Sequence, residues 1–255
     1  DFYMGGNLLS AFDAVQQGIP MRVVAADFQK DPQVIMSHPG EGLDKWEDLK
    51  NADQYILGDE GVQTFFQWMV TALGFDAAKR APYTYNTAPF LANKKSIQQG
   101  YVTSEPFAVK KEGGFVPNQF LLADYGWDTY STTIEVMQDT IDKKPEVVQC
   151  FVDGSAKGWY KYLYGDNKAA NDMIKKDNPD MSDEQIAFSI DQMKKFGLAD
   201  SGDTEKLGIG AMTDARIKSF YDKMVKAKVT PEGIDISKAY TLAFVNKGVG
   251  LDLKK

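Results

Sequence analysis

Short apolar runs alternate along the first half of the chain with segments in which apolar residues recur every three or four positions. Residues 21–26, 33–37 and 54–57 have the length and the β-branched or aromatic content of strands. Residues 8–15 and 62–73 instead carry apolar side chains at helical spacing, and a glycine follows each segment. Strands that alternate with helices in this way predict an α/β fold.

The last third of the chain has a different pattern, in which helical spacing dominates. Before it, we expect strands at residues 82–86, 119–122 and 132–137 and a helix at 89–98. From Pro145 onward we expect helices at residues 148–162, 169–174, 184–196 and 216–225. Ser182, followed by Asp183 and Glu184, resembles a capping box at the start of one of these helices. The order predicts two α/β lobes with the final helices packed on one of them.

One stretch, residues 99–107, predicts a strand that passes directly into a helix. Tyr101 and Val102 favour a strand, whereas Pro106 suits the first position of a helix. Glu105 should therefore lie at a strand-to-helix junction, together with Thr103 and Ser104. Ligands of open α/β sheets bind outside the carboxyl ends of strands, which makes this junction a candidate site. The alternative is an ordinary capped helix without a ligand.

Three other junctions have the same character. Gly5, Gly6 and Asn7 precede a helix, and we expect a glycine turn that leaves backbone N–H groups free for a ligand. The alternative is that the glycines only permit a tight turn. The pair Phe28-Gln29 ends a buried strand, and residues 58–63 form a further turn before a helix. Acidic residues in that last turn complement the helix dipole, so the turn favours a ligand that donates hydrogen bonds.

A fifth loop places two aromatic residues, Tyr125 and Trp127, on either side of a glycine. These rings could pack into the core, or they could offer a stacking platform for a ligand. We expect the ligand site to draw on all five segments. The residues expected to bind the ligand are Gly5, Gly6, Asn7, Phe28, Gln29, Asp59, Glu60, Gly61, Gln63, Thr103, Ser104, Glu105, Tyr125 and Trp127.

Charge and composition exclude several classes of function. The chain has 255 residues, with 29 Lys and Arg against 36 Asp and Glu, which gives a net charge of −7. An acidic chain whose lysines are dispersed among acids argues against a nucleic-acid partner. Apolar runs also stay well below the roughly 20 residues that a membrane-spanning helix needs.

Catalytic residues are scarce in the sequence. Cys150 is the one cysteine and lies in an apolar run, so we expect a buried core thiol, and an internal disulfide is impossible. His38 is the one histidine, and because it precedes Pro39 we expect an exposed turn residue. No nucleophile elbow, phosphate-binding loop or metal-ligand spacing occurs. We therefore expect a binding protein rather than an enzyme, without a metal or a cofactor.

The side chains also bear on the kind of ligand. The three arginines, Arg22, Arg80 and Arg216, all lie outside the proposed loops, so a bidentate clamp on a sulfonate or phosphate is hard to build. A flat nitrogen heterocycle fits better, because it could stack on Tyr125 or Trp127 and donate a hydrogen bond to Glu105.

Several segments together resemble the substrate-binding proteins of bacterial ABC transporters, and more narrowly the NMT1/THI5-like family. The segments that carry this resemblance are residues 1–2, 4–7, 23–29, 58–60, 99–107 and 144–148, followed by Gly158 and Trp159. The resemblance implies a two-lobed periplasmic binding protein fold of type II that closes on its ligand about a hinge. Known ligands of such proteins are pyrimidine precursors of thiamine, riboflavin, alkanesulfonates and nitrate.

The resemblance also implies a domain layout and partners. Residues 1–36 and 128–255 would form the first lobe and residues 37–127 the second, with hinge crossings near residues 36–38 and 124–129. The opening strand of the family is missing from this chain, so the predicted site is incomplete. We expect a monomer in the periplasm, or anchored by a lipid outside the cell, that delivers a small molecule to an ABC transporter permease.

A eukaryotic pyrimidine-synthesising enzyme shares the family name and gives a second hypothesis. That enzyme carries a cysteine-rich cluster with a neighbouring histidine, whereas here Cys150 is alone and His38 is distant in sequence. A third hypothesis, an interaction module without a ligand, leaves the repeated glycine junctions unexplained.

Overall fold

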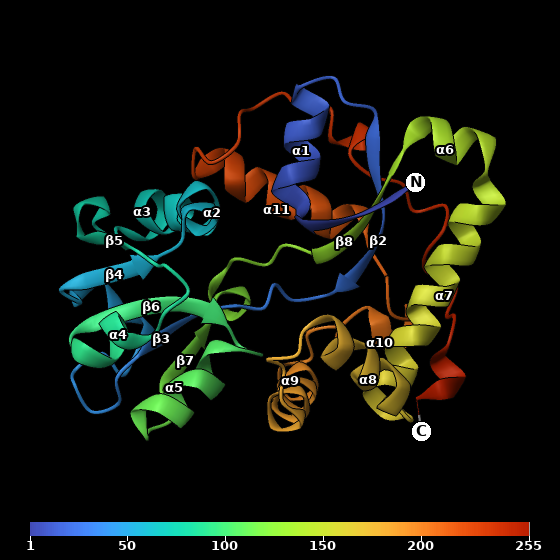
Figure 1. The fold of residues 1–255 in the computed structure, drawn as a ribbon. Coiled ribbons are helices and arrows are strands. Elements are labelled where there is room, and N and C mark those ends of the chain that lie inside the picture. The colour runs from blue at the N-terminus through green and yellow to red at the C-terminus, as the bar shows by residue number, and fades with distance from the viewer. Residues whose placement is uncertain (255) are drawn as a thin grey trace. The chain divides into compact units, whose positions relative to one another are not determined.

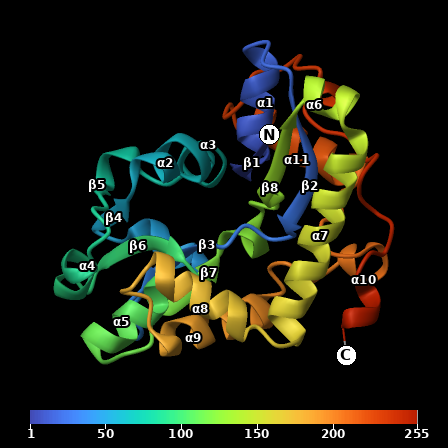
Figure 2. The ribbon, with the colours of Figure 1, turned by 45° about the vertical axis from the view of Figure 1, so that its right-hand side comes forward.

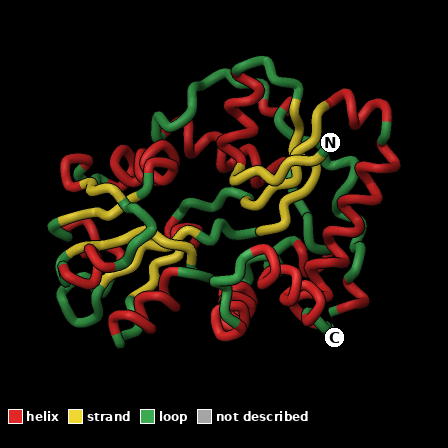
Figure 3. The backbone as a smooth tube through the Cα atoms, viewed as in Figure 1, coloured by secondary structure: helices red, strands yellow, loops and turns green. Residues whose placement is uncertain are grey.

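A computed structural model describes residues 1–254 of the chain. These residues divide into two compact units, each with its own sheet, and the strands of both sheets are drawn in yellow in Figure 3. Unit 1 contains Asp1–Asp31, Thr129–Lys223 and the chain from Thr230 onward, and unit 2 contains Pro32–Asp128 and Met224–Val229. The predicted lobe boundaries at residues 36 and 128 stay a prediction.

Unit 1 is built on a three-stranded antiparallel sheet with the order β1-β8-β2, whose strands run side by side in Figure 1. The strands are β1 (Phe2–Asn7), β2 (Met21–Phe28) and β8 (Ser131–Met137). Residues 23–28 of β2 are all buried, which explains why this strand reads as an unbroken apolar run. Helix α1 (Leu8–Gln16) follows β1 directly and buries Leu8 and Phe12 completely.

The rest of unit 1 is helical, as the spacing after Pro145 predicts (Figure 2). The helices are α6 (Gln138–Lys143), α7 (Pro145–Tyr164), α8 (Lys168–Asp177), α9 (Asp183–Phe196), α10 (Thr204–Leu207) and α11 (Asp214–Lys226), the last of which continues into unit 2. Helix α7 buries Val148, Val152, Ala156 and Tyr160, one residue per turn, which gives it a single apolar stripe. Ser182 caps α9, because its hydroxyl accepts from the Gln185 N–H at 3.2 Å.

Unit 2 contains a five-stranded mixed sheet with the order β5-β4-β6-β3-β7. Its strands are β3 (Gln33–Ser37), β4 (Gln54–Leu57), β5 (Arg80–Pro82), β6 (Ser96–Tyr101) and β7 (Asn118–Leu121). Strand β4 runs parallel to β5 and β6, whereas β3 runs antiparallel to β6 and β7. All five residues of β3 are buried, consistent with pairing on both edges.

Helices surround this second sheet. Helix α2 (Asp59–Gly61) continues through a π-helical turn at Val62–Phe66 into α3 (Gln67–Leu73). The other two helices are α4 (Ala88–Ala92) and α5 (Glu105–Gly113). Short 3₁₀ turns lie at Trp46–Asn51, Ala77–Lys79 and Leu122–Tyr125. Gly74 ends α3 in the left-handed conformation at φ 76°, which a residue with a Cβ atom adopts at a cost. Among residues 1–254, no helix combines the length and apolar character needed to cross a membrane.

Three local predictions of secondary structure are wrong. Gly5 and Gly6 lie within strand β1, where Gly5 pairs with Thr133, rather than in a turn. The expected helix at residues 89–98 ends at Ala92, and residues 96–101 form β6 because β3 and β4 pair with its two edges. The expected strand at 82–86 shrinks to β5, which ends at Pro82. Pairing partners decide these segments, and local propensity cannot reveal them.

The expectations for His38 and Cys150 are both wrong: His38 is buried and Cys150 is exposed. His38 is 5% exposed, its ring lies between Phe90 and Phe115 at centroid distances of 4.5 and 4.6 Å, and its Nε2 is 2.8 Å from the Phe90 carbonyl oxygen. Residues 36 and 37, expected as a hinge loop, lie in β3. Cys150 is exposed, because the stripe through Val148 and Val152 faces the core, which turns the opposite side of α7, where Cys150 lies, toward solvent.

Candidate functional site

The junction at residues 99–107 forms as the sequence predicts. Strand β6 ends at Tyr101, residues 102–104 turn, and α5 begins at Glu105 with Pro106 in its first turn. The turn is closed by the Ser104 N–H, which donates to the Tyr101 carbonyl at 2.9 Å. Ser104 occupies the N-cap position, but its side chain makes no capping hydrogen bond. Its hydroxyl is therefore not used to close the helix.

Glu105 is held over the end of β6 by two hydrogen bonds. Its Oε2 accepts from the Tyr101 backbone N–H at 2.7 Å, and its Oε1 accepts from the Tyr83 hydroxyl at 3.1 Å. Gly100 makes room for this arrangement, because a Cβ atom there would lie 2.7 Å from the Cβ of Glu105. Burial and then the Glu105 charge raise the pKa of Tyr83, so its phenol stays protonated and remains a donor.

Glu105 borders a cavity of about 500 Å³ within unit 2. The cavity is lined by Tyr83, Tyr85, Asn86, Thr87, Ser104, Glu105, Ala108 and Glu112. A smaller recess of about 50 Å³ shares three of these residues and is lined by Gln33, Gly58, Glu60, Tyr83, Tyr85, Gln99, Gly100, Tyr101 and Glu105. Glu105 and the two tyrosines thus stand where the cavity and the recess meet. We call the cavity and the recess together the Glu105 site.

The lining of the Glu105 site consists of carboxylates, hydroxyls, amides and two phenol rings. Neither space is lined by a lysine or an arginine, whereas Glu60, Glu105 and Glu112 all contribute. Tyr85 is 85% exposed and has a φ of 59°, an uncommon backbone conformation for a tyrosine. Such a lining attracts hydrogen-bond donors and cations and repels anions, and it offers ring surface for stacking.

The junction at residues 58–63 contributes one of its predicted residues to the Glu105 site. Glu60 lines the recess, and the Gly58 N–H donates to Gln99 Oε1 at 2.7 Å. Gly61 is buried inside the first turns of the helix, and Gln63 is exposed. Asp59 pairs with Arg80 instead, so an arginine does lie at this junction, contrary to expectation. The chain brings Arg80 there because β5 pairs with β4 in the Tyr55↔Arg80 register.

The aromatic loop does not provide the expected platform. Trp127 has no exposed surface, and its ring packs against Trp68 and Phe65 at centroid distances of 5.7 and 6.4 Å. Tyr125 is 38% exposed but stacks on Trp46 at 4.3 Å, which covers one of its faces. Trp127 is a core residue of unit 2, because burying its apolar ring stabilises the folded state more than leaving the ring in water. Thr103 lies in the turn before Ser104 and does not line the Glu105 site.

The residues of unit 1 that were expected to bind a ligand make structural contacts within unit 1 instead. Asn7 caps α1, since its Oδ1 accepts from the Leu9 N–H at 3.0 Å. Gly5 makes room for a buried carboxylate, because a Cβ atom there would lie 1.9 Å from Glu135 Oε1. Gly6 accepts a hydrogen bond from the Ser131 hydroxyl at 2.9 Å through its carbonyl. These contacts assign Gly5, Gly6 and Asn7 to the structure of the sheet and helix.

Phe28 and Gln29 are also committed to contacts inside unit 1. Phe28 is 9% exposed and meets the Trp159 ring edge-on at 5.3 Å. The Gln29 amide nitrogen donates to the Ala211 carbonyl at 2.9 Å, and the Gln29 carbonyl accepts from the Arg216 guanidinium. Arg216 also lies over the Tyr130 ring at 4.1 Å. A second arginine therefore stands at a predicted junction, brought there by α11, which is nearly 190 positions away in sequence.

Several residues of the Glu105 site were not expected from the sequence. They are Gln33, Tyr83, Tyr85, Asn86, Thr87, Gln99 and Glu112. Residues 82–86 read as a strand because tyrosine and threonine favour strands, although Asn86 before Thr87 and Pro89 is a turn signal. Glu112 stands two turns after Glu105 on α5, so helical spacing could have found it. Across residues 1–254, no group of three His, Cys, Asp or Glu side chains is placed to hold a metal ion.

Solved structures of low sequence identity share this fold. The periplasmic aliphatic sulphonate-binding protein SsuA from Escherichia coli superposes with a TM-score of 0.66 at 13% identity, over 94% of this chain and 74% of that one. The ligand-binding component of an ABC-type import system from Staphylococcus aureus, solved with zinc bound, gives 0.60 at 15% identity, over 94% and 78%. The desulfurization enzyme DSZB gives 0.53 at 11% identity, over 95% and 83%.

The fold is therefore the α/β periplasmic binding protein fold, of type II, as the sequence predicts. Within that class, a sequence profile of the family described as NMT1/THI5 like matches residues 7–170. The chain belongs to the NMT1/THI5-like family. No curated protein sequence matches this chain significantly.

Proposed function

We propose that this protein is the solute-binding component of an ABC importer, which captures a small molecule outside the cytoplasmic membrane and delivers it to a permease. Its family and fold support this role, as do the functions of two structural neighbours, a sulphonate-binding protein and a component of an import system. A monomer in the periplasm, or one anchored by a lipid outside the cell, would serve this function.

The ligand that we propose is a small heteroaromatic molecule, and specifically a pyrimidine related to the precursors of thiamine. The observation that carries this choice is the lining of the Glu105 site, which offers carboxylates, hydroxyls and phenol rings but no basic side chain. An amino group or ring N–H of a pyrimidine could donate to Glu105, and its face could stack on Tyr85. Affinity in the micromolar to nanomolar range requires roughly 8 to 12 kcal/mol.

A thermal-shift panel tests the ligand class. The panel contains 4-amino-5-hydroxymethyl-2-methylpyrimidine, riboflavin, ethanesulfonate and nitrate, each added to the purified protein. Because a ligand stabilises the state that binds it, the melting temperature should rise with the pyrimidine in proportion to the logarithm of its concentration. A rise with ethanesulfonate or nitrate alone would show that the ligand class is an anion and would refute our choice.

Two other ligand classes known for this fold are alternatives to the pyrimidine: riboflavin, and the anions alkanesulfonate and nitrate. Riboflavin uses the same stacking and hydrogen bonds, and a cavity of about 500 Å³ has the size of a site for either molecule. An alkanesulfonate or nitrate would need positive charge, which Arg80 and Arg216 could supply only by leaving Asp59 and Gln29. The ion pair and hydrogen bonds that they already make argue against an anion.

An enzyme is the alternative from another class, since DSZB shows that this fold can host catalysis. The His38 ring is enclosed by two phenylalanines, and its Nε2 meets a backbone carbonyl, so it is badly placed to act as a general base. Incubation of the protein with pyridoxal phosphate and iron should yield no pyrimidine product. Product formation above a boiled-protein control would support the enzyme instead.

A further inference from the structure

A second pocket, wholly inside unit 1, is unrelated to the residues that the proposed function uses. Its volume is about 520 Å³, and most of its lining comes from helices α7, α8 and α9. The ribbons of these three helices are labelled in Figure 2. It is lined by Ser155, Gly158, Trp159, Tyr162, Ala170, Ile174, Met181, Ile186, Ser189 and Met193. Small-molecule sites typically measure roughly 300 to 1,000 Å³ and are mostly apolar, and this pocket meets both conditions. We call it the α7–α9 pocket.

The wall that α8 forms shows that the pocket is incompletely filled by the protein. Helix α8 is amphipathic, yet none of its residues is buried, and its apolar Ala170 and Ile174 face the pocket. An amphipathic helix normally buries its apolar stripe against a core. Here that stripe borders open space, so an apolar molecule in the pocket would bury it.

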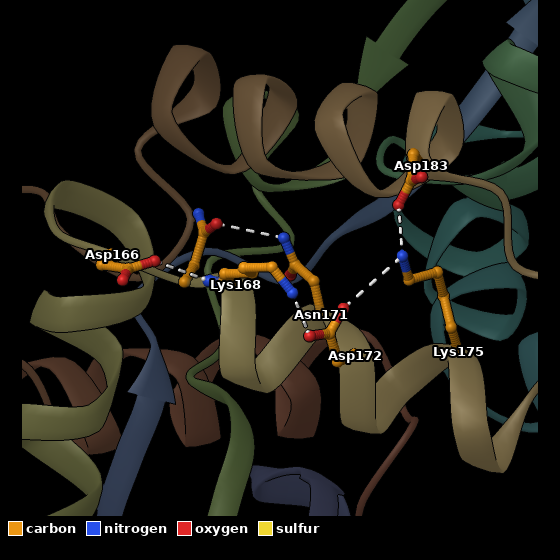
Figure 4. A network of polar contacts seen from close by, with 7 residues as sticks. Asp166, Lys168, Asn171, Asp172, Lys175 and Asp183 are labelled. Atoms are coloured by element: carbon orange, nitrogen blue, oxygen red, sulfur yellow. Dashed lines mark hydrogen bonds and ion pairs between the residues drawn. The ribbon is translucent and has the colours of Figure 1, made fainter.

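Polar contacts link α8 to the segments on either side of it. Figure 4 shows Lys168 beside Asp166 and Asp172 at the start of the helix, and Lys175 reaching the first residue of α9. The Lys175 ammonium lies 2.7 Å from Asp183 Oδ1 and 3.7 Å from Asp172 Oδ1. These exposed ion pairs join α8 to α9 at the rim of the pocket, while Ala170 and Ile174 on the apolar side of α8 stay only half-buried.

The opposite wall is an aromatic corner with a fixed orientation. The rings of Trp159 and Tyr162 stand at 87° with their centroids 6.1 Å apart. The Trp159 indole donates a hydrogen bond to the carboxyl group of Asp27, which is 3% exposed, and Phe28 meets the same indole edge-on. Because the indole is already oriented, a flat ring that stacks on it need not order it first.

The remaining lining specifies an uncharged ligand. No Asp, Glu, Lys, Arg or His lines the pocket, so a charged molecule would lose its hydration without gaining a partner. Met181 and Met193 contribute thioethers, which pack against aromatic rings and adapt to their shape. Serine and tyrosine hydroxyl groups at the wall could meet a single polar edge of the ligand.

We infer that the α7–α9 pocket binds an uncharged, flat aromatic molecule of about two fused rings, stacked on Trp159 and meeting the Tyr162 ring edge-to-face. This inference does not rest on the pyrimidine proposal, because the α7–α9 pocket and the Glu105 site share no residue.

The test is a titration of the full chain with 2-naphthol, followed through the indole N–H signals of the four tryptophans in a ¹H–¹⁵N NMR spectrum. The Trp159 signal, assigned by its loss in Trp159→Phe, should shift saturably and more than the other three. A Trp159 signal that does not move at millimolar 2-naphthol would overturn the inference.

Two glycines of α7 provide a matched pair of variants. A Cβ atom added at Gly154 or at Gly158 would meet no atom within 4 Å, but only Gly158 lines the pocket. Gly158→Leu should therefore fill part of the pocket and weaken 2-naphthol binding at least tenfold, whereas Gly154→Leu should leave it unchanged. Equal affinity in both variants would contradict the inference.

Two further measurements separate this site from its alternatives. Glu105→Ala should not change the 2-naphthol affinity, and a loss there would place the probe in the Glu105 site. Sedimentation velocity should give the same monomer for the wild type and Gly158→Leu. A dimer that Gly158→Leu dissociates would assign the pocket to a second copy of this chain instead.

Discussion

Two glycines, one in each unit, make room for a glutamate at the point where a strand leads to a helix. Gly5 in β1 leaves space for Glu135, and Gly100 in β6 leaves space for Glu105. The two carboxylates nevertheless meet different surroundings. Glu135 is 1% exposed and accepts from the Thr133 hydroxyl at 2.9 Å, whereas Glu105 borders a cavity. The same local device thus serves the core of unit 1 and a candidate ligand site in unit 2.

The different surroundings of Glu135 and Glu105 show that a strand-to-helix junction does not by itself define a ligand site. In unit 1 the Asn7 side chain closes the helix end and the glycines are paired in a strand. In unit 2 the Ser104 side chain leaves the helix end uncapped, and the chain beyond β5 leaves space beside Glu105. What surrounds the carboxylate decides whether it can meet a ligand.

The largest effect is expected from filling the space at Gly5. Gly5→Ala would place a methyl group 1.9 Å from a buried carboxylate oxygen, so strand or side chain must move. We expect the free energy of unfolding to fall by about 3 kcal/mol, at the upper end of typical overpacking costs. Gly100→Ala should lower it by about 2 kcal/mol, because its methyl group would lie 2.7 Å from the Cβ of Glu105, and that atom can move only with the backbone of α5. Urea denaturation measures both.

Gly154→Ala is the control for these glycine variants. Its added methyl group meets nothing within 4 Å, and alanine favours a helix interior by up to about 1 kcal/mol, so this variant should be stabilised. If Gly5→Ala were as stable as wild type, the assignment of Gly5 to the Glu135 contact would be wrong.

The next effect concerns ligand binding at Glu105. Glu105→Ala should weaken binding of the best ligand from the thermal-shift panel by about tenfold to a hundredfold, equivalent to about 1.4 to 2.7 kcal/mol. Stability should fall less, because the lost hydrogen bonds lie at a cavity edge that water can reach. Isothermal titration calorimetry measures the affinity, and an unchanged dissociation constant would return Glu105 to a structural role.

A smaller difference separates the two helix caps. Asn7→Ala removes the hydrogen bond to the Leu9 N–H and should lower the free energy of unfolding by about 1 kcal/mol. Ser104→Ala removes no capping hydrogen bond and should change it by less than about 0.5 kcal/mol. Thermal denaturation of the two variants side by side gives the comparison. A larger loss for Ser104→Ala would show that its hydroxyl does stabilise α5.

The smallest expected effect is a pH dependence of the free energy of unfolding that arises from Glu135 in unit 1. Burial raises the pKa of Glu135, although hydrogen bonds from Thr133 and Ser10 oppose the shift. The folded state therefore keeps this proton to a higher pH than the unfolded state does. Wild-type stability should fall as pH rises through that interval, relative to Glu135→Gln, which cannot ionise. A stability difference that stays constant between pH 4 and 7 would contradict the raised pKa.

Much of the fold was predictable because its signals are local. The strands at residues 33–37 and 54–57 have the predicted bounds, and the helices that begin near Pro145, Asp183 and Asp214 follow the spacing of their apolar residues. Family membership and the periplasmic binding protein fold were also predicted correctly. Residues 96–98 were mistaken for the end of a helix, because only their pairing with β3 and β4 makes them part of a strand.

The Glu105 site was predictable only in part. Glu105, Ser104 and Glu60 were found from the junctions, and the structure places all three along its lining. Tyr83 and Tyr85 were missed, since they approach Glu105 through tertiary contacts, and Glu112 was missed although it lies two turns after Glu105 on the same helix. Trp127 was expected at the ligand and lies in the core, because a loop sequence does not reveal which rings will pack beneath it.

The enclosed imidazole of His38 gives unit 2 a built-in spectroscopic reporter. Because the chain has no other histidine, the C2 proton of this ring gives the one histidine C2 resonance in the spectrum once the amide protons have been exchanged for deuterium. Phe90 and Phe115 lie close enough for their ring currents to displace that resonance from its position in an unfolded chain. A single line in a one-dimensional proton spectrum can thus follow the integrity of unit 2, without isotope labelling, through any of the experiments above.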